Sequence, residues 1–411
     1  MHGPIKSNAL KFGEIFKMNI LFIWPDEPFL PVSLFKHFVY LGETAGLMVQ
    51  KGHYVEVLDL SVQKISKPDF INKLKKQDVI CIPIEIYNAK SATSLVDFIH
   101  RLNVNIPIIA YGSAVTLNAE LFKPYFDFVI ASGFWGEILK SYFDNDYTNL
   151  QILNKEIKLK QFPTDIEWST PLLEKLPLKE YDGISNNQVE INTQYGCLRN
   201  CSFCMEKSFF PGKVMFQRPP ESLYKFIKEC NYIKYYLDAT TFSEDKDWCL
   251  EICKAIKATG KDIRWKTVSR IDCINDEVAK AMSSAGCHTI SLGIETLNRD
   301  IQKNIRKIIL PERIKESFLI LQKHNIQPRA LLILGLPGQT AEDIKATLEF
   351  TQKNDIPARW KEYNDLSIVK TFTKIDDFSC FERGRYFFHS IPGLSKEEYL
   401  EILHTHGRHQ Q

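Results

Sequence analysis

Residues 188–204 read Gln-Val-Glu-Ile-Asn-Thr-Gln-Tyr-Gly-Cys-Leu-Arg-Asn-Cys-Ser-Phe-Cys, and the expected architecture follows from this stretch. Its first eight residues form an alternating run that predicts a β-strand. Three cysteines come next at C-x-x-x-C-x-x-C spacing, namely Cys197, Cys201 and Cys204. In a reducing compartment, clustered cysteines bind metal more often than they form disulfides. Three thiolates leave one metal position open, which is typical of a site that performs chemistry.

The composition predicts a soluble globular protein with two domains and extensions. The chain has 411 residues, which is too long for one ordinary core, and 44% of them are hydrophobic and 25% charged. The formal net charge of +2 gives no electrostatic case for nucleic acid or an anionic membrane as a partner. No apolar run approaches the roughly 18 residues that span a bilayer, so we expect no membrane span.

The N-terminal sequence does not resemble a secretory signal, because Lys17 and Asn19 interrupt its apolar stretch. Without such a signal, the ten cysteines fit a cytoplasmic location. We expect residues 1–17 to be a weakly ordered extension.

Residues 18–145 alternate strand and helix patterns. Strands are expected at 20–24, 54–58, 79–83, 107–111 and 126–130, and helices at 34–51, 89–101 and 136–142. This alternation predicts a doubly wound, Rossmann-like α/β domain that binds ligands at the carboxyl ends of its strands. Gly112 and Ser113 follow one of these strands, so they are candidate ligand contacts, although an ordinary turn is the alternative.

The rest of the chain divides into a linker, a second α/β domain and a C-terminal extension. Residues 146–187 are polar and punctuated by prolines, which predicts an irregular linker. Residues 188–360 alternate again and predict a partial or full (β/α)6 barrel, with residues 366–371 as a possible sixth strand. Residues 361–411 are then a short C-terminal extension. Further strands are expected at 233–238, 263–268, 289–294 and 330–334.

Candidate functional residues gather on one face of this barrel. The cysteine loop follows the first strand, and Asp238, Arg270, Glu295 and the segment around Leu336 follow later strands. Active sites of β/α barrels lie at the carboxyl ends of the strands. We therefore expect these residues to surround one site.

A structural zinc site is the alternative for three nearby cysteines. Zinc needs a fourth ligand, and no second C-x-x-C or histidine pair follows; Cys230, the next cysteine, stands alone. Cys249 and Cys253 share the apolar face of an expected helix, so we assign them to the core. A 4Fe–4S cluster bound by three thiolates has one iron free, which suits this loop.

The cysteine loop, with Phe203 before its third cysteine, resembles the signature of the radical SAM superfamily. The segments 263–272, 285–296 and 333–343 resemble blocks of its cobalamin-linked branch, and pieces of residues 18–145 resemble the cobalamin-binding domain of that branch. The sequence departs from that domain in two ways. It lacks the D-x-H-x-x-G motif, and Gly112-Ser113 stands where the domain usually has Gly-Gly.

The resemblance implies an enzyme that reductively cleaves S-adenosylmethionine (SAM) at a 4Fe–4S cluster. The product would be a 5′-deoxyadenosyl radical that modifies an unactivated carbon, with cobalamin-assisted methylation as our first hypothesis. Cys197, Cys201 and Cys204 would bind the cluster. The other implied contacts are Arg270 for the SAM carboxylate, Glu295 or Asp238 for its ammonium or ribose, Phe203 and Leu336 for its adenine, and Gly112 and Ser113 for cobalamin.

Two alternatives stay open from the sequence. The first is a cobalamin-independent radical SAM epimerase, dehydrogenase, mutase or cyclase. The second, from a different class, is a non-catalytic iron–sulfur or zinc-binding protein. The expected partners are a small-molecule or peptide substrate and a low-potential electron donor such as ferredoxin or flavodoxin, because cluster potentials reach about −700 mV.

Overall fold

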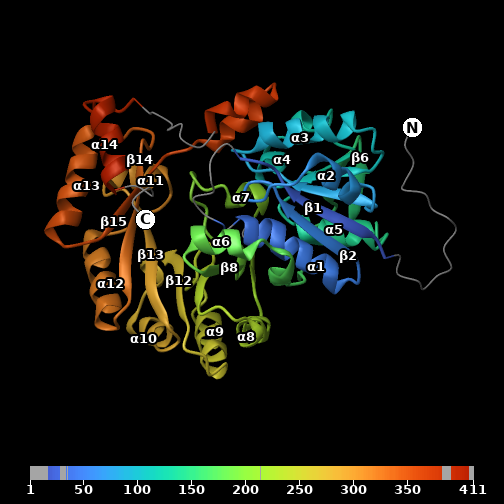
Figure 1. Ribbon diagram of the computed structural model, residues 1–411. Helices are drawn as coiled ribbons and strands as arrows, with labels where there is room; N and C mark the ends of the chain where they lie inside the picture. Colours follow the sequence, from blue (N-terminus) through green and yellow to red (C-terminus); the bar gives the residue numbers. More distant parts are fainter. Residues whose placement is uncertain (1–16, 28–33, 35, 213, 382–389, 407–411) are drawn as a thin grey trace.

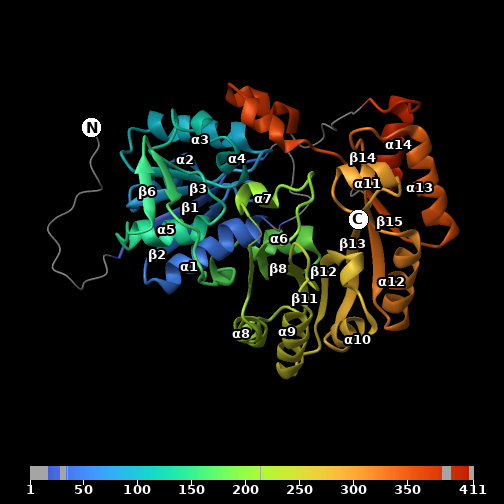
Figure 2. The same cartoon turned by 180° about the vertical axis from the view of Figure 1, so that it is seen from behind.

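Two parallel β-sheets lie side by side in the computed structural model, which describes residues 17–27, 34, 36–212, 214–381 and 390–406 (Figures 1 and 2). Almost all of the expected N-terminal extension therefore lies outside the described residues. The α/β class predicted from the sequence is confirmed for both halves.

The first sheet has seven strands in the order β2-β1-β3-β4-β5-β7-β6, and only β6 and β7 pair antiparallel. Its central strands are apolar throughout and fully buried, as expected for a parallel sheet with helices on both faces. The strands are β1 (Asn19–Trp24), β2 (Tyr54–Asp59), β3 (Val79–Pro83), β4 (Ile108–Tyr111), β5 (Phe128–Ile130), β6 (Leu150–Leu153) and β7 (Glu156–Leu159).

The part of the chain from β1 to β7 is called the first unit. Its helices follow the predicted alternation closely. One departure is that the expected helix at 34–51 begins as a π-helix, η1, before it becomes α-helical. The helical segments are η1 (His37–Glu43), α1 (Thr44–Gln50), α2 (Lys67–Leu74), α3 (Ala89–Arg101), α4 (Ser113–Leu117), η2 (Ala119–Leu121) and α5 (Trp135–Phe143).

The prediction of an irregular linker is wrong for residues 150–159, which form the β6–β7 hairpin at the edge of the first sheet. Asn154 and Lys155 make its tight turn, with φ of 48° and 67°. The hairpin was missed because its strands are short and mostly exposed, and only Ile157 buries a side chain against the sheet along β7. Residues 160–187, which we call the crossing segment, join the two sheets and contain two helical segments, η3 (Leu173–Lys175) and α6 (Leu178–Ser185).

The second sheet is an open barrel of six parallel strands in the order β15-β14-β13-β12-β11-β8. The strands are β8 (Gln188–Asn192), β11 (Lys234–Asp238), β12 (Arg264–Arg270), β13 (Cys287–Glu295), β14 (Gln327–Leu334) and β15 (Ala358–Glu362). Its helical segments are α8 (Pro220–Glu229), α9 (Lys246–Ala258), η4 (Ile271–Cys273), α10 (Asp276–Ser284), α11 (Arg299–Asn304), α12 (Pro311–Lys323) and α13 (Ala341–Lys353). Cys249 and Cys253 are buried on α9, as the periodicity predicted.

The prediction of a possible sixth strand at 366–371 is wrong. The sixth strand is β15, and residues 366–371 form a 3₁₀ helix, η5 (Leu366–Thr371). The Asp365 side chain accepts a hydrogen bond from the backbone N–H of Ser367, which starts the helix and ends the extended chain.

Residues 366–381, which we call the C-terminal strap, leave the barrel and pack on the first unit beside α3 and α4 (Figures 1 and 2). The strap consists of η5 and η6 (Ile375–Phe381). Asn118 donates hydrogen bonds to the carbonyls of Val369 and Phe372, at 2.9 and 3.2 Å. The last helix, α14 (Lys396–His406), returns to β15 of the barrel.

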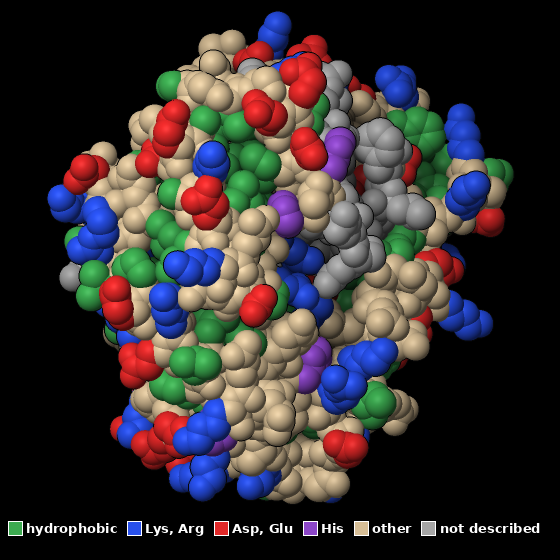
Figure 3. All heavy atoms as spheres, turned by 90° about the vertical axis from the view of Figure 1, so that its left-hand side faces the viewer, with side chains coloured by type: hydrophobic (Ala, Val, Ile, Leu, Met, Phe, Trp, Pro, Cys, Tyr) green, Lys and Arg blue, Asp and Glu red, His purple; other side chains and the backbone are tan. Residues whose placement is uncertain are grey.

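The surface over the barrel carries interspersed Lys, Arg, Asp and Glu side chains, with apolar side chains scattered between them (Figure 3). Within the described part of the chain, no helix is both long and apolar enough to cross a membrane.

Candidate active site

The cysteine loop is enclosed by a small two-stranded ribbon at the carboxyl end of β8. β9 (Gln194–Gly196) pairs antiparallel with β10 (Met215–Gln217), and the cysteines lie between them in sequence. Gly196 has φ +76°, and a Cβ there would lie 2.2 Å from the carbonyl oxygen of Val214. Only glycine fits this position, so the ribbon depends on it.

A hydrogen bond closes the base of the loop. The helix α7 (Glu206–Phe209) follows the third cysteine, and Oε1 of Glu206 accepts the backbone N–H of Gly196 at 2.8 Å. The alternation of β9 sends neighbouring side chains to opposite sides. Gln194 accepts hydrogen bonds from Thr240 and Thr241 of the barrel, whereas Tyr195 stacks on Trp168 of the crossing segment.

Each sulfur of the loop receives an N–H donor. The backbone N–H of Arg199 lies 3.4 Å from Sγ of Cys197, and Nη1 of Arg270 lies 3.8 Å from Sγ of Cys201. The backbone N–H of Glu206 points at Cys204 and lowers its thiol pKa, although burial is the larger effect and raises that pKa to about 11. Three donors aimed at three sulfurs suit anionic sulfur better than neutral thiols.

These residues fit a 4Fe–4S cluster in donor type and number. Cys201 is buried, while Cys197 and Cys204 are partly exposed. Among the described residues, no group of three His, Cys, Asp or Glu side chains is arranged to hold one metal ion. A cluster needs no such arrangement, because each of its cysteines binds a different iron. Burial raises the thiol pKa of Cys197 and Cys204, and bound metal would displace the proton from both.

A run of alternating charges surrounds the loop. Nη2 of Arg199 lies 2.8 Å from Oε1 of Glu244 and 3.7 Å from Asp272, and Arg270 holds Asp272 with two hydrogen bonds of 2.8 and 3.0 Å. The sequence did not predict Arg199, Glu244 and Asp272 as site residues. The acidic partners of Arg199 lie 45 and 73 residues away in sequence, so only the fold brings them together.

Glu295 forms a buried ion pair at the carboxyl end of β13. Its Oε1 accepts a hydrogen bond from Nζ of Lys307 at 2.7 Å, and both side chains are less than one-tenth exposed. Glu295 also has φ +69°, a strained conformation for a residue other than glycine. A Cβ at Gly293 would lie 2.4 Å from Nζ of Lys307, so that glycine makes room for the pair. Lys307 is a fourth site residue that the sequence did not predict.

The structure brings Phe203 and Leu336 together. Both belong to one small apolar cluster with Ile301 and Ile305, beside the cysteine loop. Leu336 lies in the loop after β14, where the side chain of Gln339 accepts backbone N–H groups and fixes the turn. A flat apolar ligand group would contact both residues here.

The remaining predicted residues lie at the junction of the two sheets. Asp238 ends β11, and its carbonyl accepts the backbone N–H of Thr193 at 2.8 Å. Gly112 and Ser113 follow β4 of the first unit, and Ser113 donates a hydrogen bond to Glu85 at 2.8 Å. Gly112 has φ +115°, and a Cβ would lie 2.5 Å from the carbonyl oxygen of Ile84. This glycine is therefore required by the chain's own packing.

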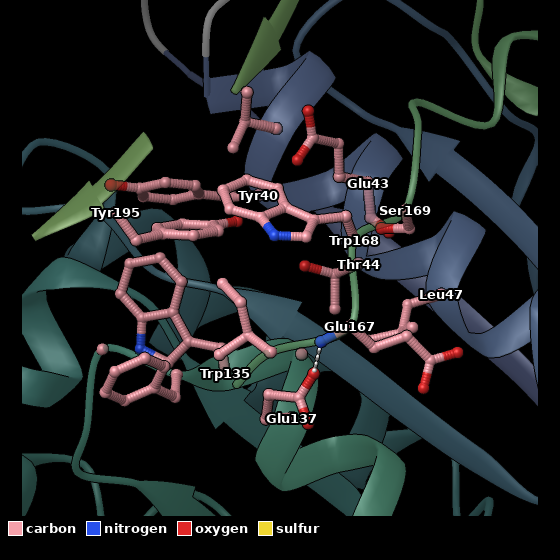
Figure 4. A pocket seen from close by; sticks show the side chains of 15 residues that line it. Tyr40, Glu43, Thr44, Leu47, Trp135, Glu137, Glu167, Trp168, Ser169 and Tyr195 are labelled. Atoms are coloured by element: carbon pink, nitrogen blue, oxygen red, sulfur yellow. Dashed lines mark hydrogen bonds between the residues drawn. The ribbon is translucent and has the colours of Figure 1, made fainter. Parts of the chain in front are cut away.

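A narrow cavity lies between the first unit, the crossing segment and β9 (Figure 4). Its walls carry five aromatic side chains, and the backbone N–H of Glu167 donates a hydrogen bond to Glu137 at its edge. The aromatic residues are Tyr40, Phe134, Trp135, Trp168 and Tyr195. The water-accessible volume is about 40 Å³, which is room for a few water molecules.

Comparison with known proteins agrees with this geometry. Residues 191–351 match the Radical SAM superfamily. The chain is 28% identical, over 75% of its length and 72% of the relative's, to a protein of Pyrococcus horikoshii described as the uncharacterized methyltransferase PH0819.

Two solved structures share the fold of both units. The radical SAM methyltransferase TsrM of Kitasatospora setae, with cobalamin and a 4Fe–4S cluster bound, aligns with a TM-score of 0.66 at 13% identity, covering 86% of this chain and 74% of TsrM. The cobalamin-dependent SAM radical enzyme OxsB aligns with a TM-score of 0.68 at 16% identity, covering 95% of this chain and 61% of OxsB.

Residues 191–351, which contain the cysteine loop, thus match a radical SAM domain. A 4Fe–4S cluster and SAM are the cofactors that this domain implies. The unit that precedes it has the fold of the cobalamin-binding domains in the two neighbours.

Proposed function

We propose that this protein is a radical SAM enzyme that transfers a methyl group to an unactivated carbon with the help of cobalamin. One observation carries the proposal: the carboxyl edges of the two sheets face each other. Burial raises the pKa of Tyr40, and Glu85 of the first unit and Glu206 and Asp238 of the barrel raise it further. Carboxylates from both sheets thus act on one side chain. A ligand on the first sheet would face the cysteine loop.

The resemblance to named methyltransferases supports the direction of this chemistry. The relative from Pyrococcus horikoshii covers three-quarters of this chain and is described as a methyltransferase. TsrM, with the same arrangement of two units, is described as a methyltransferase with cobalamin bound. Both descriptions belong to those proteins, and for this chain they are the basis of a proposal.

Each predicted site residue would have its own role in this reaction. Cys197, Cys201 and Cys204 would bind the cluster, which supplies one electron to break a carbon–sulfur bond of SAM. The apolar cluster of Phe203 and Leu336 would take the adenine. Glu295, whose Oε1 binds Lys307, would accept a hydrogen bond from the ammonium or a ribose hydroxyl at its second oxygen.

The fit to cobalamin is incomplete. The aromatic walls of the cavity at the first sheet suit a large flat molecule in character. However, the cavity has room for only a few water molecules, and Gly112 and Ser113 contact Ile84 and Glu85 of the same unit. Cobalamin would therefore bind only if the side chains at this edge moved apart. This observation favours a second candidate, a radical SAM enzyme that acts without cobalamin.

Two measurements on the reconstituted full-length protein separate these functions. Protein purified from cobalamin-fed cells should show corrin absorption, and protein without it would support the second candidate. With SAM and dithionite, both candidates should cleave SAM and release 5′-deoxyadenosine, and methyl transfer should also release S-adenosylhomocysteine. The Cys201→Ala variant should lose the cluster and all cleavage while its far-ultraviolet circular dichroism is unchanged. Cleavage by this variant would contradict the cluster assignment.

A further inference from the structure

Arg270 has its guanidinium oriented in a way that the sequence did not predict. Nε and Nη2 donate to the two carboxylate oxygens of Asp272, at 2.8 and 3.0 Å, and Nη1 points at Sγ of Cys201 at 3.8 Å. The side chain is about nine-tenths enclosed, with 10% of its surface exposed. Asp272 therefore occupies the Nε/Nη2 edge of the guanidinium, and the Cys201 sulfur occupies Nη1 of its other edge.

We propose that Arg270 acts on the cluster through Cys201 and raises its reduction potential, with Asp272 setting how much of the positive charge the cluster feels. Reduction adds a negative charge to the cluster, so a neighbouring cation stabilises the reduced state. Hydrogen bonds to cluster sulfurs are a recognised means of setting such potentials. Arg270 is thus a positioning and tuning residue rather than the cation for the SAM carboxylate.

The surrounding charges support a fixed orientation. Asp272 also lies 3.7 Å from Arg199, which lies inside the loop between Cys197 and Cys201 and is held by Glu244. The contacts form a closed circuit from Cys201 through Arg270, Asp272 and Arg199 back to the loop. A guanidinium with partners on both sides has little freedom to rotate toward another ligand.

Two substitutions that should shift the reduction potential in opposite directions test the inference. Arg270→Gln removes the cation and should lower the reduction potential of the SAM-free cluster. Asp272→Asn removes the carboxylate that neutralises it and should raise that potential. We expect a shift of about tenfold in the equilibrium constant for one-electron reduction in each direction, or about 59 mV. The potential is measured by redox titration of the reconstituted full-length protein, followed by electron paramagnetic resonance.

The matched control is Arg264→Gln, because Arg264 is exposed at the amino end of the same strand, β12. It removes the same charge far from the cysteine loop and should leave the potential unchanged. Arg270→Lys keeps the charge and should shift the potential less than Arg270→Gln does. If Arg270→Gln binds no iron, Asp272→Asn decides alone: a rise supports the inference, and no shift overturns it.

The contrary result is also well defined. If Arg270 bound the SAM carboxylate, Arg270→Gln would leave the SAM-free potential unchanged and abolish the spectral change that SAM causes. That outcome would overturn the inference. The inference rests on the cluster assignment and not on methyl transfer, since it is measured without substrate or cobalamin. A wild-type protein that shows the predicted shifts but transfers no methyl group would refute only the proposed function.

Discussion

A buried carboxylate with three partners anchors the first unit at the residue scale. Asp59 ends β2 and is fully buried, and His37 of η1 lies 2.6 Å from its Oδ2. Tyr181 of the crossing segment donates to the same oxygen at 2.5 Å, and Ser61 donates to Oδ1 at 2.6 Å. Burial alone would raise the pKa of Asp59, but His37, Ser61 and Tyr181 together hold that pKa below its ordinary value.

This lowered pKa gives a signed prediction for stability against pH. A carboxyl whose pKa is lower in the folded chain stabilises it above the unfolded pKa of about 3.9, and loses this effect as pH falls through the folded value. Asp59→Asn should therefore lower the free energy of unfolding by about 3 kcal/mol at pH 7, and by progressively less below pH ~4. Urea midpoints at pH 7 and pH 3 measure the difference. An equal loss at both pH values would refute the ion-pair account.

The exposed Asp300 provides the control for this substitution. Its side chain is 84% exposed, and its Oδ1 accepts a hydrogen bond from Nζ of Lys303 at 2.8 Å. Asp300→Asn should leave the urea midpoint close to the wild-type value at either pH. The contrast isolates the effect of burial from that of removing a charge.

At the scale of elements, the β9–β10 ribbon controls whether the cysteine loop can form. Gly196→Ala would bring Cβ against the Val214 carbonyl as well as impose a strained φ. We expect the variant to lose most of its reconstituted iron while its circular dichroism stays near wild type. Gly212→Ala is the control, since it has φ +94° with no atom within 4 Å of the added Cβ. It carries only the backbone strain, about 1–2 kcal/mol. Equal iron in the two variants would show that the ribbon does not shape the loop.

Much of this architecture was predictable because hydrophobic periodicity reports long, buried elements well. β3 and α3 lie where the sequence placed them, and the three cysteines are read directly. The β6–β7 hairpin and η5 were missed because short, exposed segments carry little periodic signal. The contacts of Arg199 and Lys307 were unpredictable for another reason: each depends on which strand ends the fold brings together.

For the whole molecule, the C-terminal strap joins the two units by a route separate from the crossing segment. Phe378 is 1% exposed and packs on Phe122 of the first unit and Phe372 of the strap, with ring centroids 5.8 and 5.1 Å apart. Val369 and Phe381 extend the same apolar contact. The strap therefore buries part of the first unit's surface with residues that follow the barrel in sequence.

Removing this anchor should loosen the strap and leave the active site intact. Phe378→Ala should lower the stability of the packed strap by about 3–5 kcal/mol, because it leaves a cavity at a buried aromatic site. Limited proteolysis should then cut the strap faster, while iron content stays at the wild-type value. Leu319→Ala, at a side chain that is 66% exposed on α12, should change neither. A loss of iron in Phe378→Ala would mean that the strap also supports the cysteine loop.

The strap also has a consequence for how the chain folds as it is synthesised. The first sheet is complete at Leu159, but the residues that cover its α3 and α4 side begin at Leu366. At a synthesis rate of about 5–20 residues per second, the ribosome makes the strap roughly 10–40 s after the first sheet is complete. During that interval an apolar face is open to chaperones or to a neighbouring nascent chain. Translation speed through the barrel should thus affect the yield of folded protein.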